Sequence, residues 1–260
     1  MLIPITRARL ATVRHWFQPE RPGPLVAQHV LATGNGTCLA DRWPDPRALV
    51  VQTGGNYTFA GDLGALDPGD LRDHVAGFVE APAPFMPLLR AAFGEVAEWR
   101  RVILTPEGPD GPLPAPGGGH LVRRLDAGDG EPLSALGPET AWIANTWGGP
   151  AGLAASGMGW GAFAGPRLVA VACPFFVGEA HEDLGVATEP GFRGLGLSTA
   201  CAGEVARDVR RRGRVPTWTT SPDNTASLRV AAKLGFRLRR RDVLQVVGVP
   251  VPQPARREGA

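Results

Sequence analysis

A glycine-rich segment with one arginine, Arg193-Gly194-Leu195-Gly196-Leu197-Ser198, holds the residues of this sequence best suited to bind a phosphate. It joins an apolar run at residues 184–188, which predicts a strand, to a predicted helix that reaches about Arg212. Helix N-termini expose unpaired N–H groups and carry a partial positive charge, so they bind anions. Glycine lets the backbone approach a ligand closely, and the arginine adds a fixed charge. The segment therefore predicts a cradle for a pyrophosphate.

Two other phosphate-binding motifs contain a glycine-rich loop, and neither fits this one. A P-loop needs Gly-Lys-Ser/Thr, whereas the only lysine of the chain is Lys233. The three-glycine dinucleotide fingerprint is also missing. The loop alone is equally compatible with a simple turn at the start of a helix, so the ligand must be inferred from a second segment.

That second segment consists of a strand, a turn and a helix. Residues 215–220 predict a buried strand, and residues 221–224 a turn whose side chains can cap a helix. Residues 225–234 predict a helix that ends at Gly235. Asn224 and Ser227 stand at the start of this helix, where their plainer interpretations are a helix cap and a surface serine.

Taken together, the two segments resemble the GNAT (GCN5-related N-acetyltransferase) superfamily, and most closely the GNAT proteins related to the zwittermicin A resistance acetyltransferase. The resemblance is strong over roughly residues 160–236 and weak before them. It rests on Gly185, Val186, Thr188, Pro190, Phe192, Arg193, Gly194, Gly196, Leu197, Pro216, Trp218, Asn224, Ser227, Lys233, Leu234, Gly235 and Phe236. Ser198 departs from the family pattern of Gly or Ala, but a serine still leaves the backbone amide free.

The resemblance implies an α/β protein with the GNAT acyltransferase fold, in which helices flank a central mixed, mostly antiparallel sheet. It also implies acetyl-CoA as cofactor and direct transfer of the acetyl group to a primary amine of a small molecule, such as an antibiotic or another metabolite. The strands that contain Val186 and Val215 are expected to separate and open a slot for pantetheine. The residues expected to contact coenzyme A are Val186, Ala187, Thr188, Arg193, Gly194, Leu195, Gly196, Leu197, Ser198, Asn224 and Ser227.

The candidate catalytic residues are Glu182 and Asp183, at a position where GNAT enzymes often carry a carboxylate that acts as general base. Side chains alternate across a strand, so only one of the two can face the substrate slot. Spacing favours Glu182, whereas Asp183 matches the acidic position of the nearer relatives, and the choice between them stays open. His181 is a third candidate, and a solvated strand end is the plainer interpretation of all three.

No side chain is evident as general acid. Many GNAT enzymes carry a tyrosine in the helix after Asn224, but the matching residue is Ala231, and the only tyrosine, Tyr57, lies far off in the N-terminal half. Water or the substrate ammonium would then protonate the thiolate. This absence supports a rival interpretation, a catalytically silent acyl-CoA-binding module that acts as sensor or scaffold.

The domain boundaries follow from a composition break at residues 105–119, TPEGPDGPLPAPGGG, which can sustain neither a helix nor a central strand. We expect an N-terminal α/β domain over residues 1–106, a linker over residues 107–119 and the acetyltransferase domain over residues 120–260. The N-terminal domain is either a degenerate copy of the GNAT fold or a cap. No convincing internal repeat decides between them, and the cap is slightly favoured.

Within the N-terminal domain, residues 48–52 and 57–60 predict two strands joined by the Gly54-Gly55 turn. Residues 70–80 predict an amphipathic helix, and residues 85–93 a second helix.

Composition limits the cellular roles. The net charge of +2 gives little attraction to nucleic acid or membrane, so the arginines of residues 207–214 and 237–241 are interpreted first as a solvated face. Neither a transmembrane run nor a signal peptide is evident. Cys38, Cys173 and Cys201 are widely spaced, without metal-type pairing, which indicates reduced, mostly buried thiols of a cytoplasmic protein. We expect a monomer or homodimer without a metal.

Overall fold

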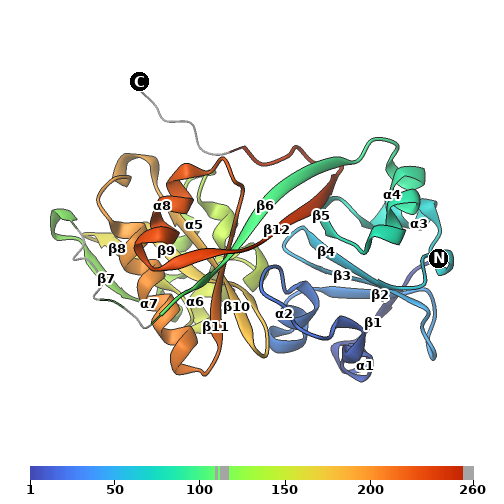
Figure 1. The fold of residues 1–260 in the computed structure, drawn as a ribbon. Coiled ribbons are helices and arrows are strands. Elements are labelled where there is room, and N and C mark those ends of the chain that lie inside the picture. Colours follow the sequence, from blue (N-terminus) through green and yellow to red (C-terminus); the bar gives the residue numbers. More distant parts are fainter. Residues whose placement is uncertain (109–110, 112–116, 254–260) are drawn as a thin grey trace.

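The computed structural model describes residues 1–108, 111 and 117–253. Two halves lie side by side, and the long strands β6 and β12 run between them (Figure 1). The elements of the N-terminal half are β1 (Ile3–Ile5), α1 (Arg7–Thr12), η1 (Arg14–Phe17), α2 (Val26–Thr33), β2 (Thr37–Ala40), β3 (Ala48–Thr53), β4 (Asn56–Gly61), η2 (Leu63–Ala65), α3 (Pro68–His74), β5 (Gly77–Glu80), η3 (Ala83–Phe85), α4 (Met86–Phe93) and β6 (Ala97–Pro106).

The C-terminal half repeats this order: strand, two α-helices, three strands, helix, strand, helix, strand. Its elements are η4 (Gly117–Gly119), β7 (Leu121–Arg124), η5 (Ala127–Asp129), α5 (Gly130–Ser134), η6 (Ala141–Trp147), α6 (Pro150–Ser156), β8 (Trp160–Ala164), β9 (Arg167–Val177), β10 (His181–Thr188), η7 (Pro190–Phe192), α7 (Leu197–Arg211), β11 (Val215–Thr220), α8 (Thr225–Lys233) and β12 (Phe236–Val247). This recurrence is the element order that a degenerate copy of the same fold would have, and the choice between copy and cap stays a prediction.

All these strands form one sheet, in the order β1-β2-β3-β4-β5-β12-β6-β11-β10-β9-β8-β7. The halves exchange their final strands, because β12 pairs with β5 and β6 pairs with β11. β6 and β12 pair with each other along their length. The pairs β4–β5 and β10–β11 are parallel, and the other pairs are antiparallel, so the sheet is mixed and mostly antiparallel, as expected.

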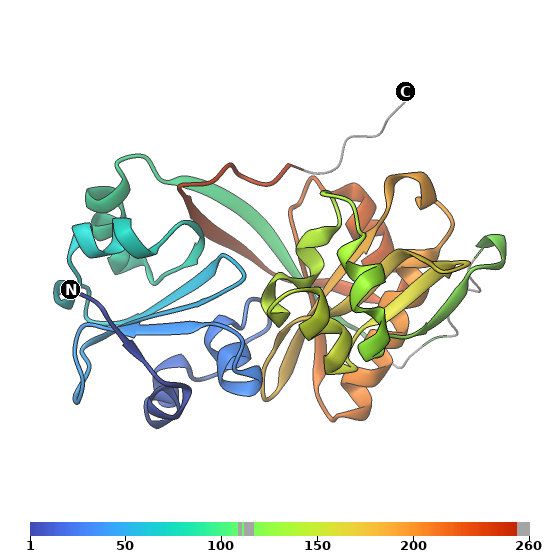
Figure 2. The ribbon, with the colours of Figure 1, turned by 180° about the vertical axis from the view of Figure 1, so that it is seen from behind.

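Helices cover both faces of the sheet. In β10, Leu184 packs into a hydrophobic core with α7, whereas a side chain at Gly185 would meet Ile143 of η6. Because side chains alternate along a strand, α7 and η6 lie on opposite faces. Figure 2 shows the helices of residues 130–156 in front of the C-terminal strands, and Figure 1 shows α7 and α8 on the other side. We refer to these as the η6 face and the α7 face.

The strands expected at residues 48–52 and 57–60 are confirmed as β3 and β4. The helix expected over residues 70–80 is wrong in its second part, because α3 ends at His74 and β5 begins at Gly77. Gly77 has a φ of +147°, and a Cβ there would lie 2.1 Å from the carbonyl oxygen of Gly55. The turn between β3 and β4 thus approaches residue 77 so closely that only an extended glycine fits.

The three cysteines are buried and form no disulfide, as their spacing predicted. Burial raises the pKa of Cys38 and that of Cys201 to about 12, so neither thiol is reactive at neutral pH. No helix in the described residues is long and apolar enough to cross a membrane.

Candidate active site

The two parallel strands of the C-terminal half separate in the middle of the sheet. β10 pairs with β11 from His181–Val215 to Leu184–Trp218, and the pairing then ends. From Gly185 to Thr188, β10 pairs only with β9. One backbone edge of β10 therefore lacks a strand partner there, at the position predicted for pantetheine, and we refer to this unpaired edge as the slot.

The predicted phosphate loop follows directly. Gly194 and Gly196 both have positive φ, of 84° and 78°, which bends the chain sharply before α7 begins at Leu197. No side chain caps α7, and its first hydrogen bond runs from the amide of Ala200 to the carbonyl of Gly196. Within the described residues, no partner is present for the backbone amides of residues 194–199. These donors at the start of a long helix form an anion-binding arrangement.

The side chains around the loop are already engaged with one another. Arg193 Nη2 donates to Glu139 Oε2 at 2.6 Å, and both side chains are exposed. The hydroxyls of Thr188 and Ser198 share a hydrogen bond of 2.7 Å, which ties the end of β10 to the first turn of α7. Ser198, which departs from the family pattern, thus links the end of β10 to the phosphate loop.

The base of the loop is fixed by the buried carboxylate of Glu189. It accepts hydrogen bonds from the amide of Gly137 at 3.0 Å and from the hydroxyl of Thr140, and it pairs with Arg167 at 3.3 Å. The segment before η6 is therefore attached to the phosphate loop at two points, through Glu189 and through Arg193.

Asn224 and Ser227 lie at the start of α8. The Asn224 Oδ1 accepts from the amide of Ser227 at 3.1 Å, which is the helix-cap arrangement. The Ser227 Oγ accepts from the indole N–H of Trp218 at 2.9 Å. Both side-chain oxygens thus have internal partners, and cofactor contact by either residue stays a prediction.

Glu182 faces α7 and is fully buried. Its carboxylate accepts hydrogen bonds from Arg212 Nε and Nη2, at 3.0 and 2.6 Å, and from Arg214 Nη1 at 2.7 Å. Two of the arginines interpreted from sequence as a solvated face therefore neutralise a buried acid. Glu182 has the surroundings of a structural ion pair and lies on the face opposite η6.

Asp183 projects to the η6 face beside the slot and is 4% exposed. Its Oδ1 accepts from the hydroxyls of Thr217 and Thr219, at 2.6 and 2.9 Å. Burial raises the pKa of Asp183, although these two hydrogen bonds offset part of the effect. The position of Asp183 beside the slot and its raised pKa would suit a proton acceptor.

A β-bulge in β9 places aromatic residues next to Asp183. The register shifts opposite Asp183 and Leu184, which frees the carbonyls of Pro174 and Phe175. The indole N–H of Trp147 donates to the first at 2.8 Å, and the hydroxyl of Thr146 to the second at 2.7 Å. These bonds hold η6 over the slot. Pro174 inside an apolar strand was a sequence signal for the bulge, since proline cannot donate to the ladder.

The N-terminal half supports η6 from the side. His29 of α2 is fully buried, and its Nε2 donates to the carbonyl of Thr146 at 2.7 Å while its Nδ1 accepts from the amide of Val177 at 3.1 Å. Burial lowers the pKa of His29 to about 4, so the ring is neutral. Glu20 accepts from the amides of Glu179, Ala180 and His181, in the turn before β10.

The N-terminal half has no equivalent of the phosphate loop. After β4, the carboxylate of Asp62 accepts from the amide of Gly64 at 2.9 Å, and Asp67 accepts from Gly69 at 2.7 Å. These side chains supply negative charge where an anion would have to sit. Among the described residues, the loop after β10 has a run of open amides, whereas two amides of the loop after β4 are taken up by aspartate side chains.

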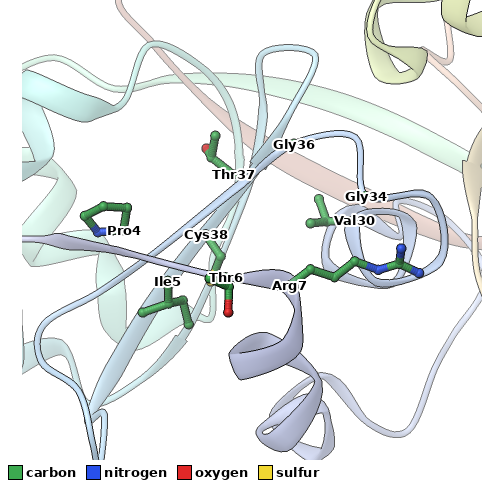
Figure 3. A pocket seen from close by; sticks show the side chains of 9 residues that line it. All are labelled: Pro4, Ile5, Thr6, Arg7, Val30, Gly34, Gly36, Thr37 and Cys38. Atoms are coloured by element: carbon green, nitrogen blue, oxygen red, sulfur yellow. The ribbon is translucent and has the colours of Figure 1, made fainter.

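A separate cavity of about 270 Å³ lies in the N-terminal half, between β1, β2 and the end of α2 (Figure 3). Arg7 at its rim donates to the carbonyls of Leu31 and Ala32, at 2.7 and 3.0 Å, and thereby caps α2. No residue of the slot or the phosphate loop lines this cavity.

The comparisons with known proteins agree with this architecture. A family model described as GNAT acetyltransferase matches residues 133–241. The chain is 42% identical, over 76% of its length and 84% of the other, to the uncharacterized N-acetyltransferase in the mutA 5′ region of Streptomyces virginiae. It is 23% identical, over 90% of its length and 94% of the other, to the uncharacterized N-acetyltransferase YdfB of Bacillus subtilis strain 168.

Among solved structures, a GCN5-related N-acetyltransferase-like protein from Streptococcus suis superposes with a TM-score of 0.69 at 17% identity, over 94% of this chain and 100% of that one. A tandem GNAT protein from the clavulanic acid biosynthesis pathway superposes with a TM-score of 0.57 at 14% identity, over 97% and 99%. The fold is thus that of the GNAT acetyltransferases. This chain belongs to that family and is a GNAT-type acetyltransferase.

Proposed function

We propose that this protein transfers an acetyl group from acetyl-CoA to a primary amine of a small molecule, by direct transfer in a ternary complex. The observation that carries the proposal is the run of unpartnered amides at residues 194–199, next to the slot between β10 and β11. These amides would hold the diphosphate of coenzyme A, and the free edge of β10 would bind the pantetheine. When bound, acetyl-CoA supplies the acyl group.

In this proposal Asp183 is the general base. An amine acceptor arrives as an ammonium ion and must lose a proton before it can react. Asp183 lies beside the slot on the η6 face, and its raised pKa makes it a better proton acceptor than an ordinary carboxylate. Glu182 forms ion pairs with Arg212 and Arg214 and has a structural role in this proposal.

No tyrosine is available to protonate the departing thiolate from α8. Ala231 at the expected position is fully buried, and Tyr57 is buried in the core of the N-terminal half. The ammonium proton taken up by Asp183, or water, would serve instead.

The experiment is a turnover assay on the full chain with acetyl-CoA and five amines: ethanolamine, β-alanine, 1,5-diaminopentane, tyramine and glucosamine. Thiol release and the mass of the acetylated product are followed together. Amine-dependent thiol release supports the proposal. Tight acetyl-CoA binding in calorimetry without turnover of any amine favours the silent acyl-CoA-binding module, and no binding at all rejects both.

A further inference from the structure

We infer that Trp142 contacts the amine acceptor and determines its specificity, and that Glu139 is a positioning residue that links Trp142 to the cofactor loop. The inference rests on the proposed function, because it assigns the acceptor side of the same slot. Its starting point is that Trp142, at 40% exposed, is the one tryptophan among the exposed large apolar side chains of the described residues.

The indole is connected, through Phe175, to the strand that carries the candidate base. Its ring packs edge-on against Phe175, with 5.5 Å between the centroids. Phe175 is so close to β10 that a Cβ on Gly185 would lie 3.2 Å from its Cβ. Gly185 is two residues from Asp183 on the same face of the strand, where β10 leaves β11. The Trp142–Phe175 pair therefore lies on the face of β10 from which an amine would approach Asp183.

The chemistry of this pair suits the proposed acceptor. The face of an indole attracts an ammonium ion electrostatically, and the attraction grows as water is excluded. Asp183, on the same face of the strand as Gly185, would supply the proton acceptor. Trp142 would thus hold the cationic form of the amine, and the apolar carbon chain next to it, until Asp183 removes the proton.

One residue connects this ring to the phosphate loop. The indole N–H of Trp142 donates to the carbonyl oxygen of Glu139 at 3.1 Å, and the carboxylate of Glu139 accepts from Arg193 at 2.6 Å. A diphosphate held by the neighbouring amides would compete with that carboxylate for the Arg193 guanidinium, because both are oxyanions. Coenzyme binding would then release Glu139 and shift Trp142 with it.

The consequence is that the coenzyme and the acceptor influence each other's binding, and such coupling is reciprocal. Three variants test it: Trp142→Phe, Glu139→Gln and, as a matched control, Glu131→Gln, which alters an exposed acid on α5 that has no side-chain partner among the described residues. Each protein is titrated with coenzyme A, and tryptophan emission is recorded beside calorimetry.

We expect coenzyme A to change the emission of the native chain, and Trp142→Phe to lose most of that change while it binds coenzyme A normally. Glu139→Gln should show a smaller change and bind coenzyme A up to about fivefold more tightly, the upper range for an exposed ion pair. Glu131→Gln should match the native chain. An undiminished signal in Trp142→Phe, or Glu139→Gln indistinguishable from Glu131→Gln, overturns the inference.

Kinetics with the best acceptor of the five amines show whether Trp142 contacts the acceptor or only supports the fold. Trp142→Ala should raise the KM for that amine about three- to fivefold, as expected for loss of an exposed cation–π contact, with kcat within about twofold. Trp142→Phe should recover part of the loss. A native chain that fails to bind coenzyme A would reject the proposed function and this inference together, whereas normal binding with unchanged Trp142 variants rejects the inference alone.

Discussion

The Nδ1 of His29 accepts a hydrogen bond from the amide of Val177, and this 3.1 Å contact joins the helix α2 to the bulged strand beside Asp183. The other ring nitrogen donates to the carbonyl of Thr146 in η6. One neutral imidazole thus ties both η6 and the end of β9 to the N-terminal half. A ring protonated on Nδ1 could no longer accept from Val177, so the contact depends on pH.

Acidification should therefore destabilise the protein. The pKa of His29 is about 4 in the folded state against 6.5 in the unfolded chain, so the unfolded state binds the proton first. The contribution is complete above pH 6.5 and is lost as the pH falls toward 4. The difference corresponds to about 3 kcal/mol.

Urea unfolding at pH 7.5, 6, 5 and 4.5 measures this effect. His29→Gln should be less stable than the native chain at pH 7.5 and should show a shallower decline in stability on acidification. His15→Gln, which changes an exposed imidazole, serves as control and should follow the native curve. Parallel curves for His29→Gln and the native chain would show that His29 does not sense the pH.

A second contact between the halves predicts a non-additive pair. A Cβ at Gly178 would lie 2.6 Å from both carboxylate oxygens of Glu20, which bind the turn before β10. Gly178→Ala should cost about 1–3 kcal/mol by overpacking. Glu20→Ala should cost at least about 2 kcal/mol, because three amides lose their acceptor.

The double variant Glu20→Ala/Gly178→Ala shows whether the cost of Gly178→Ala comes from contact with the Glu20 carboxylate. Once Glu20 is truncated, the added methyl group at residue 178 has no carboxylate to meet, so Gly178→Ala should cost much less in the Glu20→Ala background. If denaturant unfolding gave the same loss of unfolding free energy for Gly178→Ala with and without Glu20, the strain would not come from the Glu20 carboxylate.

Substitution in the phosphate loop should weaken coenzyme A binding strongly and leave the fold intact. In Arg193→Ala/Gly196→Asp the guanidinium is lost and a carboxylate stands among the open amides, so affinity for coenzyme A should fall at least about tenfold. Gly196 has open space around it but a φ of +78°. Gly213→Asp, with a φ of +74° and equally open space at the other end of α7, controls for that strain. Unchanged affinity in calorimetry would contradict the site assignment.

The two adjacent acids should respond in opposite ways. Asp183→Asn keeps the side-chain shape but cannot accept a proton, so kcat/KM should fall by about 10²-fold or more while the affinity for coenzyme A stays within about twofold. In the native chain, activity should be lost on acidification at a higher pH than for an ordinary carboxylate, because burial raises the pKa of Asp183.

Glu182→Gln should instead unfold at lower denaturant and leave the pH profile of the rate unchanged. It breaks a buried ion pair with Arg212 and Arg214, which costs about 3 kcal/mol or more. The assignment of the base would have to be reversed if Glu182→Gln kept full stability but lost activity, and Asp183→Asn kept its activity.

What sequence could predict here was local. The loop at residues 193–198, the strand before it and the helix after it could be predicted because glycine spacing, hydrophobic runs and periodicity act over a few neighbouring residues. The alternation of a strand also required that Glu182 and Asp183 face opposite ways, although not which way each faces. The helix expected over residues 70–80 failed because a distant turn, at Gly55, determines the conformation of Gly77.

The contacts around η6 could not be predicted, because their partners are far apart in the chain. His29 meets Thr146, and Glu139 meets Arg193, only once the strands are in register. The exchange of β6 and β12 is of the same kind. No local pattern in either strand indicates which half it will join.

Because β6 and β12 are exchanged between the halves, the C-terminal half should not fold well when it is expressed alone. A truncation that keeps residues 120–260 would remove β6, leave β11 with a bare edge and strip β12 of both its neighbours. The unpaired N–H and C=O groups of β11 and β12 could then pair with strands of other molecules, so the fragment should aggregate. The half without the open amides therefore remains necessary to the sheet that carries them.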